Sequence, residues 1–330
     1  MSQFKVVVTD YNYDTFEPEK EVFNKMGIEL NFEQCQTEDD VIEKCRDADA
    51  LLNQYAPISR RVIENLDNLK VVARYGIGVN TVDLEAATEN GVAVGNVTDY
   101  CLDEVSDHAM ALLLSSVRKV TQLNNDVKDG NWDFKIAKPV YRLRGRTLGL
   151  VGFGNIPQTL TTKAQAFGLN VIAYDPFVPK EVADELSVRL VEIDELYEQS
   201  DYVSVHLPLN NKTEKMINLD AFKKMKKETF IINTSRGPVI DEEGLIEALQ
   251  TNEIAGAGLD VLEQEPIDAD SPLLKMDQVL INPHAAFYSV EAEAELKRKT
   301  AQNAADVLSG YFPDYLVNKD VKEKVNLKEK

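Results

Sequence analysis

Short apolar runs alternate with polar, amphipathic segments over roughly the first 95 residues. The runs are Phe4–Val8, Ile28–Phe32, Ala50–Leu52, Val71–Ala73 and Val92–Val94. The segments between them include Pro18–Met26, Glu38–Cys45 and Ser59–Leu66, whose patterns are typical of helices. Buried-strand runs that alternate with helical segments predict βαβ units on a parallel sheet.

A second alternating series begins at Thr147. Its apolar runs are Leu148–Val151, Val171–Tyr174, Tyr202–Val205, Phe230–Ile232, Gly258–Val261 and Val279–Ile281. Its helical segments are Thr159–Phe167, Val191–Glu198, Leu219–Met225 and Glu242–Leu249. Six such strands predict a doubly wound sheet of the nucleotide-binding kind.

Two longer helical patterns flank this second series. Residues from Asp103 to about Lys128 form the longest one, which Gly130 ends, and we expect a single helix there. A second pattern runs from Val290 to about Ser309. A helix that follows a sheet in this way often joins two lobes, so both patterns are candidates for domain boundaries.

The composition indicates a globular protein that does not bind nucleic acid. Of 330 residues, 44% are hydrophobic and 28% are charged, which excludes disorder and collagen-like structure. Acidic residues outnumber basic ones 56 to 36, for a formal charge of −20. That field repels phosphate backbones and anionic lipid, so we expect no nucleic-acid partner and no membrane partner.

Cysteine usage and the amino terminus indicate a cytoplasmic protein. Cys35, Cys45 and Cys101 form no C-x-x-C pair, and an odd count suits a reducing compartment. The first residues lead directly into the run Phe4–Val8 rather than into a signal-peptide pattern. No apolar run approaches the roughly 20 residues that a membrane span needs. We expect no metal site.

A glycine motif in the second series predicts a dinucleotide site. The strand Leu148–Val151 leads into Gly152-Phe153-Gly154-Asn155-Ile156 and then a helix. Gly152 allows the tight turn, and Gly154 allows the backbone to approach a pyrophosphate at the helix N-terminus. The third glycine position of the motif holds Pro157 instead, so helix and strand must pack differently there.

Asp175 indicates which dinucleotide binds. It ends the next predicted strand, 21 residues after Gly154. A carboxylate at this place accepts hydrogen bonds from ribose hydroxyls and repels a 2′-phosphate. No Arg or Lys follows until Lys180, so the sequence favours NAD over NADP. The alternative is a glycine turn in a sheet without a nucleotide.

Three charged residues each follow a predicted strand of the second series. Arg236 lies in N-T-S-R-G, Glu265 in D-V-L-E-Q-E-P and His284 in N-P-H-A-A. Ligands bind at the carboxyl ends of the strands in such sheets. Reduction of a 2-keto acid needs a cation for the carboxylate, an acid for the carbonyl oxygen and a group that tunes that acid. These residues supply all three.

From Arg74 to about Asn318 the chain resembles the D-isomer-specific 2-hydroxyacid dehydrogenases. It has the family's glycine motif and its N-T-S-R-G, G-L-D-V-x-x-x-E-P and P-H-A-A segments, in the family's order and spacing. The resemblance implies that Arg236 binds substrate, that His284 is the acid–base and that Glu265 pairs with it. The segments 284–289 and 310–318 look most like the C-terminal-binding-protein-like branch, which has tryptophan in place of Phe287.

The motifs and the resemblance together imply two sets of binding residues. The cofactor-binding set is Gly152, Gly154, Asn155, Ile156, Asp175, His206, Thr234, Ser235, Arg236, Asp260 and His284. The substrate-binding set is Arg74, Gly76, Ile77, Gly78 and Phe287. A structural ion pair is the alternative for Arg74, and backbone geometry is the alternative for His206. We expect His108 to be a structural or interlobe residue.

The resemblance also implies the architecture. We expect an α/β protein of two Rossmann-like lobes. Residues 1–100 and 290–330 would form a flavodoxin-like substrate domain, and residues 101–289 a doubly wound, parallel-sheet NAD-binding domain. The family's usual assembly is a homodimer through the nucleotide lobe, and we expect the same here.

The expected function is NAD-dependent interconversion of a small 2-keto acid and a D-2-hydroxy acid. One alternative is an NAD(H)-responsive, corepressor-like binding protein with little turnover. Another is the same chemistry on 3-phosphoglycerate or phosphite. Formate dehydrogenases of this superfamily have glutamine where this chain has Glu265, which argues against that activity.

Overall fold

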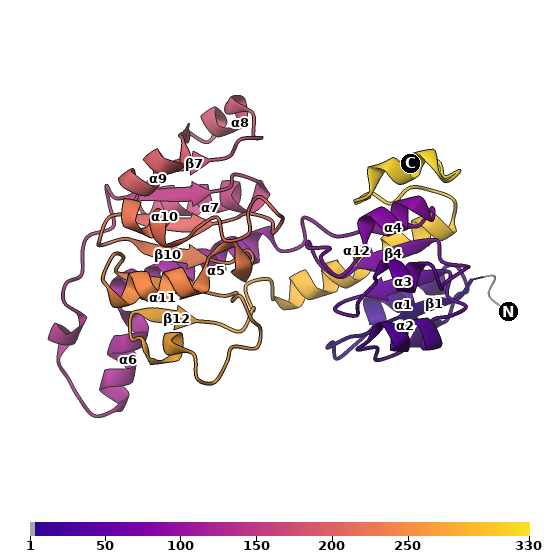
Figure 1. The fold of residues 1–330 in the computed structure, drawn as a ribbon, viewed down its shortest axis with the longest axis horizontal. Coiled ribbons are helices and arrows are strands. Elements are labelled where there is room, and N and C mark those ends of the chain that lie inside the picture. Colours follow the sequence, from indigo (N-terminus) through magenta and orange to yellow (C-terminus); the bar gives the residue numbers. More distant parts are fainter. Residues whose placement is uncertain (1–3) are drawn as a thin grey trace. The chain divides into compact units, whose positions relative to one another are not determined.

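A computed structural model describes residues 4–330 of the chain. The fold divides into two compact units (Figure 1). The first unit joins the residues up to Tyr100 to Ser289–Lys330, and the second unit is Cys101–Tyr288. The amino-terminal and carboxyl-terminal segments therefore belong to one unit, and each unit is described by itself below.

The first unit is a parallel sheet of five strands in the order β2-β1-β3-β4-β5. The strands are β1 (Val6–Val8), β2 (Leu30–Phe32), β3 (Ala50–Asn53), β4 (Val71–Arg74) and β5 (Ala93–Gly95). The helices are α1 (Glu17–Asn24), α2 (Glu38–Lys44), α3 (Arg60–Ile63), α4 (Leu84–Glu89) and α12 (Val290–Leu308), with a 3-10 turn at Lys319–Glu323. This order confirms the predicted flavodoxin-like sheet.

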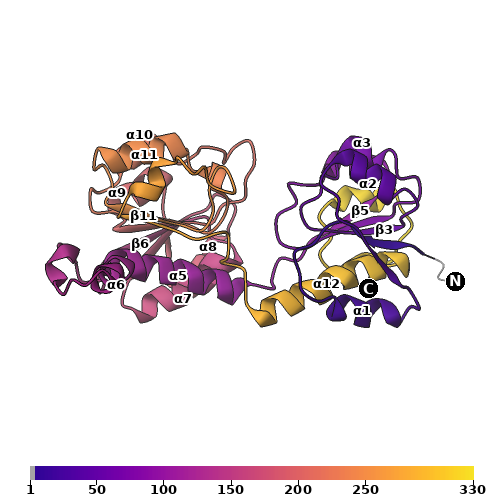
Figure 2. The same cartoon turned by 90° about the horizontal axis from the view of Figure 1, so that it is seen from below.

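Helices cover both faces of that sheet (Figure 2). α1 and α12 pack together on one face, while α2 and α3 lie on the other. β1 and β5 are fully buried and apolar because helices cover both faces of the sheet, whereas the edge strand β2 exposes Asn31. The predicted strands and the predicted helix from Val290 are all present.

The second unit is a parallel sheet of seven strands in the order β12-β11-β10-β9-β6-β7-β8. The strands are β6 (Thr147–Val151), β7 (Asn170–Tyr174), β8 (Arg189–Leu190), β9 (Tyr202–Val205), β10 (Phe230–Asn233), β11 (Gly256–Leu259) and β12 (Val279–Ile281). The order runs outward from β6 in both directions, which confirms the predicted doubly wound sheet. The pattern missed β8 because this edge strand is only two residues long.

Helices lie on both faces of this sheet as well, with α5 and α7 on one side and α9, α10 and α11 on the other (Figure 2). The helices are α5 (Leu102–Arg118), α6 (Val120–Lys128), α7 (Asn155–Ala166), α8 (Lys180–Glu185), α9 (Ile193–Gln199), α10 (Leu219–Lys224) and α11 (Glu242–Gln250). Short 3-10 turns occur at Phe134–Ala137, Gly237–Val239 and Pro272–Lys275. Across residues 4–330, no helix has both the length and the apolar character of a membrane span.

The expectation of a single helix from Asp103 to Lys128 was wrong. Lys119 adopts a left-handed conformation with φ of 56°, which ends α5 and starts α6. Its backbone N–H donates to the carbonyls of the last turn of α5, and its ammonium lies 5.6 Å from the centre of the Phe230 ring. The hydrophobic period continues across this break, so periodicity alone did not reveal it. α12, with 19 residues, is longer than α5, with 17.

Glycine at position 149 is required by close packing between β6 and α9. A Cβ on Gly149 would lie 2.1 Å from the Ser200 hydroxyl and 2.8 Å from a Leu196 methyl group. We predict that Gly149→Ala lowers the free energy of unfolding by about 1–3 kcal/mol, because the core must shift to admit the methyl group. Urea denaturation followed by circular dichroism measures this change.

The control for that variant is Gly154→Ala, because a Cβ on Gly154 meets no atom within 4 Å and the residue has an ordinary negative φ. Equal losses in the two variants would contradict the packing explanation.

Candidate active site

Three segments leave the carboxyl ends of adjacent strands β10, β11 and β12 in register. The Asp260 N–H donates to the Asn233 carbonyl at 2.9 Å, and the His284 N–H donates to the Asp260 carbonyl at 2.8 Å. The hydrogen-bond ladder of the sheet therefore continues past the strands themselves. Arg236, Glu265 and His284 all lie on these three segments, so the sheet brings the predicted catalytic segments to one edge of the second unit.

Asn233 organises the segment that carries Arg236. Its buried side chain donates to the Arg236 carbonyl at 3.0 Å and accepts the Ser235 N–H at 3.0 Å. Gly237 follows, where a Cβ would lie 1.8 Å from the Leu262 carbonyl oxygen. The N-T-S-R-G segment thus lies directly against the one that carries Glu265. The sequence pattern indicates Arg236, but it does not indicate that Asn233 shapes the loop that carries Arg236.

Glu265 and His284 form a hydrogen-bonded pair. Glu265 Oε2 lies 2.8 Å from His284 Nδ1, and Oε1 accepts the Leu262 N–H at 3.1 Å. Partial burial acts to raise the pKa of Glu265, but the hydrogen bond and charge of His284 outweigh it, so that this pKa lies below its usual range. The carboxylate is therefore ionised and fixes Nδ1, which leaves Nε2 of a 43% exposed side chain for a ligand.

His284 lies in a strained backbone turn, and the Asp260 carboxylate accepts hydrogen bonds from the two residues that follow it. The φ of His284 is 52°, a left-handed conformation that is rare for a residue with a side chain. The Asp260 carboxylate accepts the Ala285 N–H through Oδ1 and the Ala286 N–H through Oδ2, each at 2.9 Å. Such backbone strain persists only where the surroundings enforce it. Contact between Asp260 and a cofactor stays a prediction.

The glycine motif has the geometry of a dinucleotide-binding turn. Gly152 has φ of 94°, and a Cβ there would lie 2.6 Å from the His206 carbonyl oxygen. Nothing in the protein requires glycine at position 154, so the open space there fits a pyrophosphate that approaches the backbone. α7 begins at Asn155, and Pro157 is buried in its first turn. The residues fit the group that the motif predicts, with Asn155 and Ile156 offering N–H groups.

Asp175 lies next to this turn, as predicted. One carboxylate oxygen accepts the Phe153 N–H at 2.9 Å, and the other accepts the Phe177 N–H at 2.8 Å. The carboxylate thereby ties the end of β7 to the glycine turn. Its contact with a ribose stays a prediction.

Of the remaining predicted cofactor residues, His206 and Ser235 have structural partners of their own, whereas the buried Thr234 hydroxyl has no hydrogen-bond partner among the described residues. His206 lies 2.8 Å from the Ser204 hydroxyl through Nε2, and desolvation lowers the pKa of His206 to about 3, so its ring is neutral. The Ser235 hydroxyl donates to the Asn233 side chain, and Thr234 is buried. Roles for His206, Thr234 and Ser235 in cofactor binding remain predictions.

In the first unit, the predicted substrate loop follows β4. Arg74 donates through Nη1 to the Tyr75 carbonyl, and a Cβ on Gly76 would lie 1.9 Å from that nitrogen. The Ile77 carbonyl accepts from the Asn96 side chain at 2.7 Å, which holds the loop at Ile77, and Gly78 follows directly. The arginine thus lies over the backbone of its own loop, and its contact with substrate stays a prediction.

Two further side chains lie close to the histidine segment. The Phe287 ring lies edge-on to the His284 imidazole, with 6.3 Å between ring centres. His108 Nε2 on α5 lies 3.4 Å from Asp260 Oδ1. The sequence pattern does not predict the pairing of His108 with Asp260, because the two residues are far apart in the chain and only helix packing brings them together.

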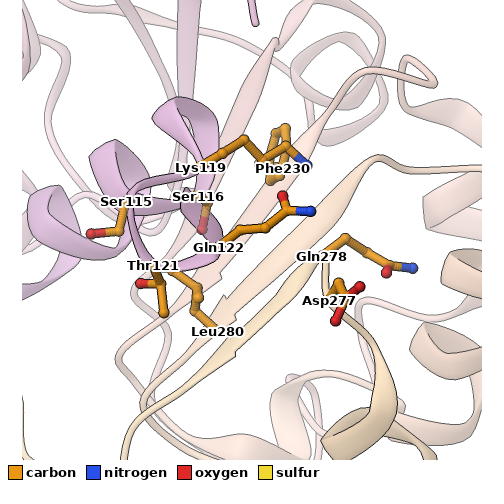
Figure 3. Close-up of a pocket in the computed structure, with 9 residues that line it drawn as sticks. All are labelled: Ser115, Ser116, Lys119, Thr121, Gln122, Phe230, Asp277, Gln278 and Leu280. Atoms are coloured by element: carbon orange, nitrogen blue, oxygen red, sulfur yellow. The ribbon is translucent and has the colours of Figure 1, made fainter. Parts of the chain in front are cut away.

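A small hollow elsewhere in this unit contains none of the predicted residues (Figure 3). It lies at the opposite, amino-terminal ends of β10 and β12, with Lys119, Gln122 and Phe230 around it. The candidate active site lies at the carboxyl ends of the strands, so this hollow is not part of it.

Comparison with known proteins extends these observations. Residues 110–286 match the family described as "D-isomer specific 2-hydroxyacid dehydrogenase, NAD binding domain". The chain is 38% identical to a glyoxylate reductase of Korarchaeum cryptofilum, covering 85% of this chain and 86% of that protein. It is also 38% identical to a D-3-phosphoglycerate dehydrogenase of Methanocaldococcus jannaschii, covering 95% of this chain but only 59% of that protein.

Among solved structures, the chain resembles a glyoxylate reductase from Paecilomyes thermophila, with a TM-score of 0.87 and 27% identity. The match covers 96% of this chain and 99% of that one. These matches confirm the predicted family resemblance and the fold of two parallel sheets. The assignment to the C-terminal-binding-protein-like branch stays a prediction.

The space at Gly154 gives a test of the dinucleotide site. We predict that Gly154→Ala raises the Kd for NADH by about tenfold, because the methyl group occupies the space of the pyrophosphate. The free energy of unfolding should fall by no more than about 1 kcal/mol, because Gly154 is the N-cap of α7 and alanine is less favoured than glycine there. Quenching of NADH fluorescence in a titration measures the Kd, and an unchanged Kd would remove Gly154 from the site.

Proposed function

The chain belongs to the D-isomer-specific 2-hydroxyacid dehydrogenase family, and on that premise we propose that it interconverts a 2-keto acid and a D-2-hydroxy acid through His284, Glu265 and Arg236. The family determines the class of reaction, an NAD-dependent oxidoreduction at a carbinol carbon. The observation that carries the residue assignment is the His284–Glu265 pair at 2.8 Å, held at the carboxyl end of the NAD-binding sheet.

Each of the three residues has one task in this proposal. Arg236 binds the substrate carboxylate with its planar guanidinium, which suits two parallel hydrogen bonds. His284 donates the proton on Nε2 to the carbonyl oxygen, which becomes the hydroxyl. Glu265 keeps Nδ1 protonated and stabilises the imidazolium form. NADH, when bound, supplies the hydride that C2 receives. In the reverse direction, neutral His284 accepts the hydroxyl proton.

For the substrate, we propose a small 2-keto acid of the glyoxylate type. The support is the glyoxylate reductase of K. cryptofilum, which the chain matches over most of both lengths. Arg74, the backbone of Gly76, Ile77 and Gly78, and Phe287 are the residues proposed to bind the substrate. The second candidate substrate is a phosphorylated acid, because one of the relatives is a D-3-phosphoglycerate dehydrogenase.

The decisive experiment is NADH oxidation with a panel of 2-keto acids. The panel comprises glyoxylate, pyruvate, hydroxypyruvate, phenylpyruvate and 3-phosphohydroxypyruvate. We predict turnover with glyoxylate or hydroxypyruvate. His284→Ala should lower kcat by about 10²–10⁴-fold, since it removes the general acid.

Two further variants separate chemistry from binding. Arg236→Ala should raise KM as well as lower kcat, and Arg236→Lys should recover only part of the loss because lysine lacks the planar fork. NADH affinity should stay within about threefold in His284→Ala. NADH binding without turnover on any acid would instead favour an NAD(H)-responsive binding protein.

We propose that the chain forms a homodimer through the segment from Val120 to Tyr141, called the arm below. Its exposed apolar side chains are Val120, Val127, Trp132, Phe134, Ile136, Val140 and Tyr141. Trp132 is 90% exposed and Phe134 is 68% exposed. A concentration of exposed, large apolar side chains in one segment is typical of a protein interface, and the family's usual assembly is the reason to name a second copy as the partner. The three buried free cysteines support a cytoplasmic location.

The arm can be tested by the oligomeric state. We predict that the wild-type chain sediments at twice its 37.0 kDa mass. Replacing both Trp132 and Phe134 by Gln should shift it toward the monomer. The matched control is Phe177→Gln, which removes an 87% exposed ring of the same unit outside the arm. A dimer that persists in the double variant would contradict the assignment.

A further inference from the structure

Asp260 is a buried carboxylate whose charge needs compensation. It is 1% exposed, and its oxygens accept the Ala285 and Ala286 N–H groups. Burial acts to raise the pKa of Asp260, but hydrogen bonding to His108 and to the two N–H groups outweighs it and places this pKa below its usual range. The carboxylate therefore remains charged within the core, and an uncompensated charge there would be costly.

His108 is the titratable side chain of α5 that reaches this carboxylate, and it forms an ion pair there when it is protonated. Its Nε2 lies 3.4 Å from Asp260 Oδ1, which is an ion-pair distance. Hydrogen bonding to Asp260 is the largest cause that raises the pKa of His108, and Asn282 adds to it. A single side chain of α5 therefore pairs with the residue that holds the His284 turn.

The neighbouring charged side chains on α5 form ion pairs with a different residue. Asp103 and Asp107 both pair with Lys163 of α7, at 3.2 Å and 2.7 Å. Glu265 is the other carboxylate whose charge interacts with Asp260, and it is bound to His284. Of these groups, only His108 brings positive charge to Asp260.

We propose that His108 is a positioning residue for His284: by pairing with Asp260 it holds the carboxylate that fixes the left-handed turn carrying the acid–base imidazole. This inference rests on the proposed role of His284 as the acid–base. It adds His108 as a residue that affects the reaction through Asp260 and His284. Without His108, the buried carboxylate must rotate or take up a proton to relieve its charge. Either change weakens a hydrogen bond to Ala285 or Ala286, and the turn at His284 relaxes away from Glu265.

The kinetic test compares two variants of His108 with a neighbour on the same helix. His108→Leu should lower kcat by about tenfold, because a small displacement of the acid weakens proton transfer. His108→Gln keeps a neutral donor to Asp260 and should recover part of the loss. The primary isotope effect with deuterated NADH should rise in His108→Leu, while the Kd for NADH stays within about twofold.

Asp107→Asn is the matched control. It removes an ion pair from the adjacent residue of α5, on the side that faces Lys163, and should leave kcat and the isotope effect unchanged. A His108→Leu protein with lower thermal stability but wild-type kcat and isotope effect would overturn the proposal, since His108 would then be structural only.

A spectroscopic test works without turnover. The chain has three histidines, so imidazole NMR resonances can be assigned by single substitutions. We expect the His284 ring signals to shift in both His108 variants and to stay in place in Asp107→Asn. Unshifted His284 signals in His108→Gln would overturn the proposal. If these signals shift but the wild-type chain reduces no acid, the positioning stands and the proposed function fails.

The pairing also predicts a dependence of stability on pH. The pKa of His108 is raised in the folded protein, so its stabilising contribution is fully present below about pH 6.5 and is lost as the pH rises through the folded value. The difference in unfolding free energy between wild type and His108→Gln should shrink over that range. A difference that does not depend on pH would mean that His108 acts by packing alone.

Discussion

The site depends on one constraint, which is the charge of Asp260 inside the core of the second unit. A buried carboxylate must find donors, and here two of them are the backbone N–H groups that follow His284. Satisfying the charge therefore also determines the backbone of the acid–base residue. The left-handed conformation at His284, with φ of 52°, is maintained by this arrangement rather than by any preference of histidine.

The parallel sheet provides the frame for that constraint. Strands β10, β11 and β12 are hydrogen-bonded neighbours, and their ladder extends to Asp260 and His284. Segments that are distant in sequence thus begin side by side, with Asn233 and Gly237 shaping the first and Asp260 the third. The same sheet carries the glycine turn after β6, so one edge combines a dinucleotide-binding turn with an acid–base pair.

Charge in this site is arranged in pairs. Glu265 is ionised against His284, and Asp260 is ionised against His108, while His206 is kept neutral by desolvation. The three histidines of the chain consequently have three different environments. The overall charge of −20 is a property of the whole chain, whereas these local pairs determine the charges at the site.

The sequence by itself determined the strands, the doubly wound order and the residues that lie at strand ends, because burial on both faces leaves continuous apolar runs and because Arg236, Glu265, His284 and the glycine motif follow those runs directly. It did not determine the break at Lys119 or the short edge strand β8. Nor did it pair His108 with Asp260 or assign Asn233 its role. Those features arise from contacts between segments that are far apart in the sequence. The spacing of hydrophobic residues does not indicate which buried charged side chain meets which hydrogen-bond donor. Only packing α5 against the sheet decided that.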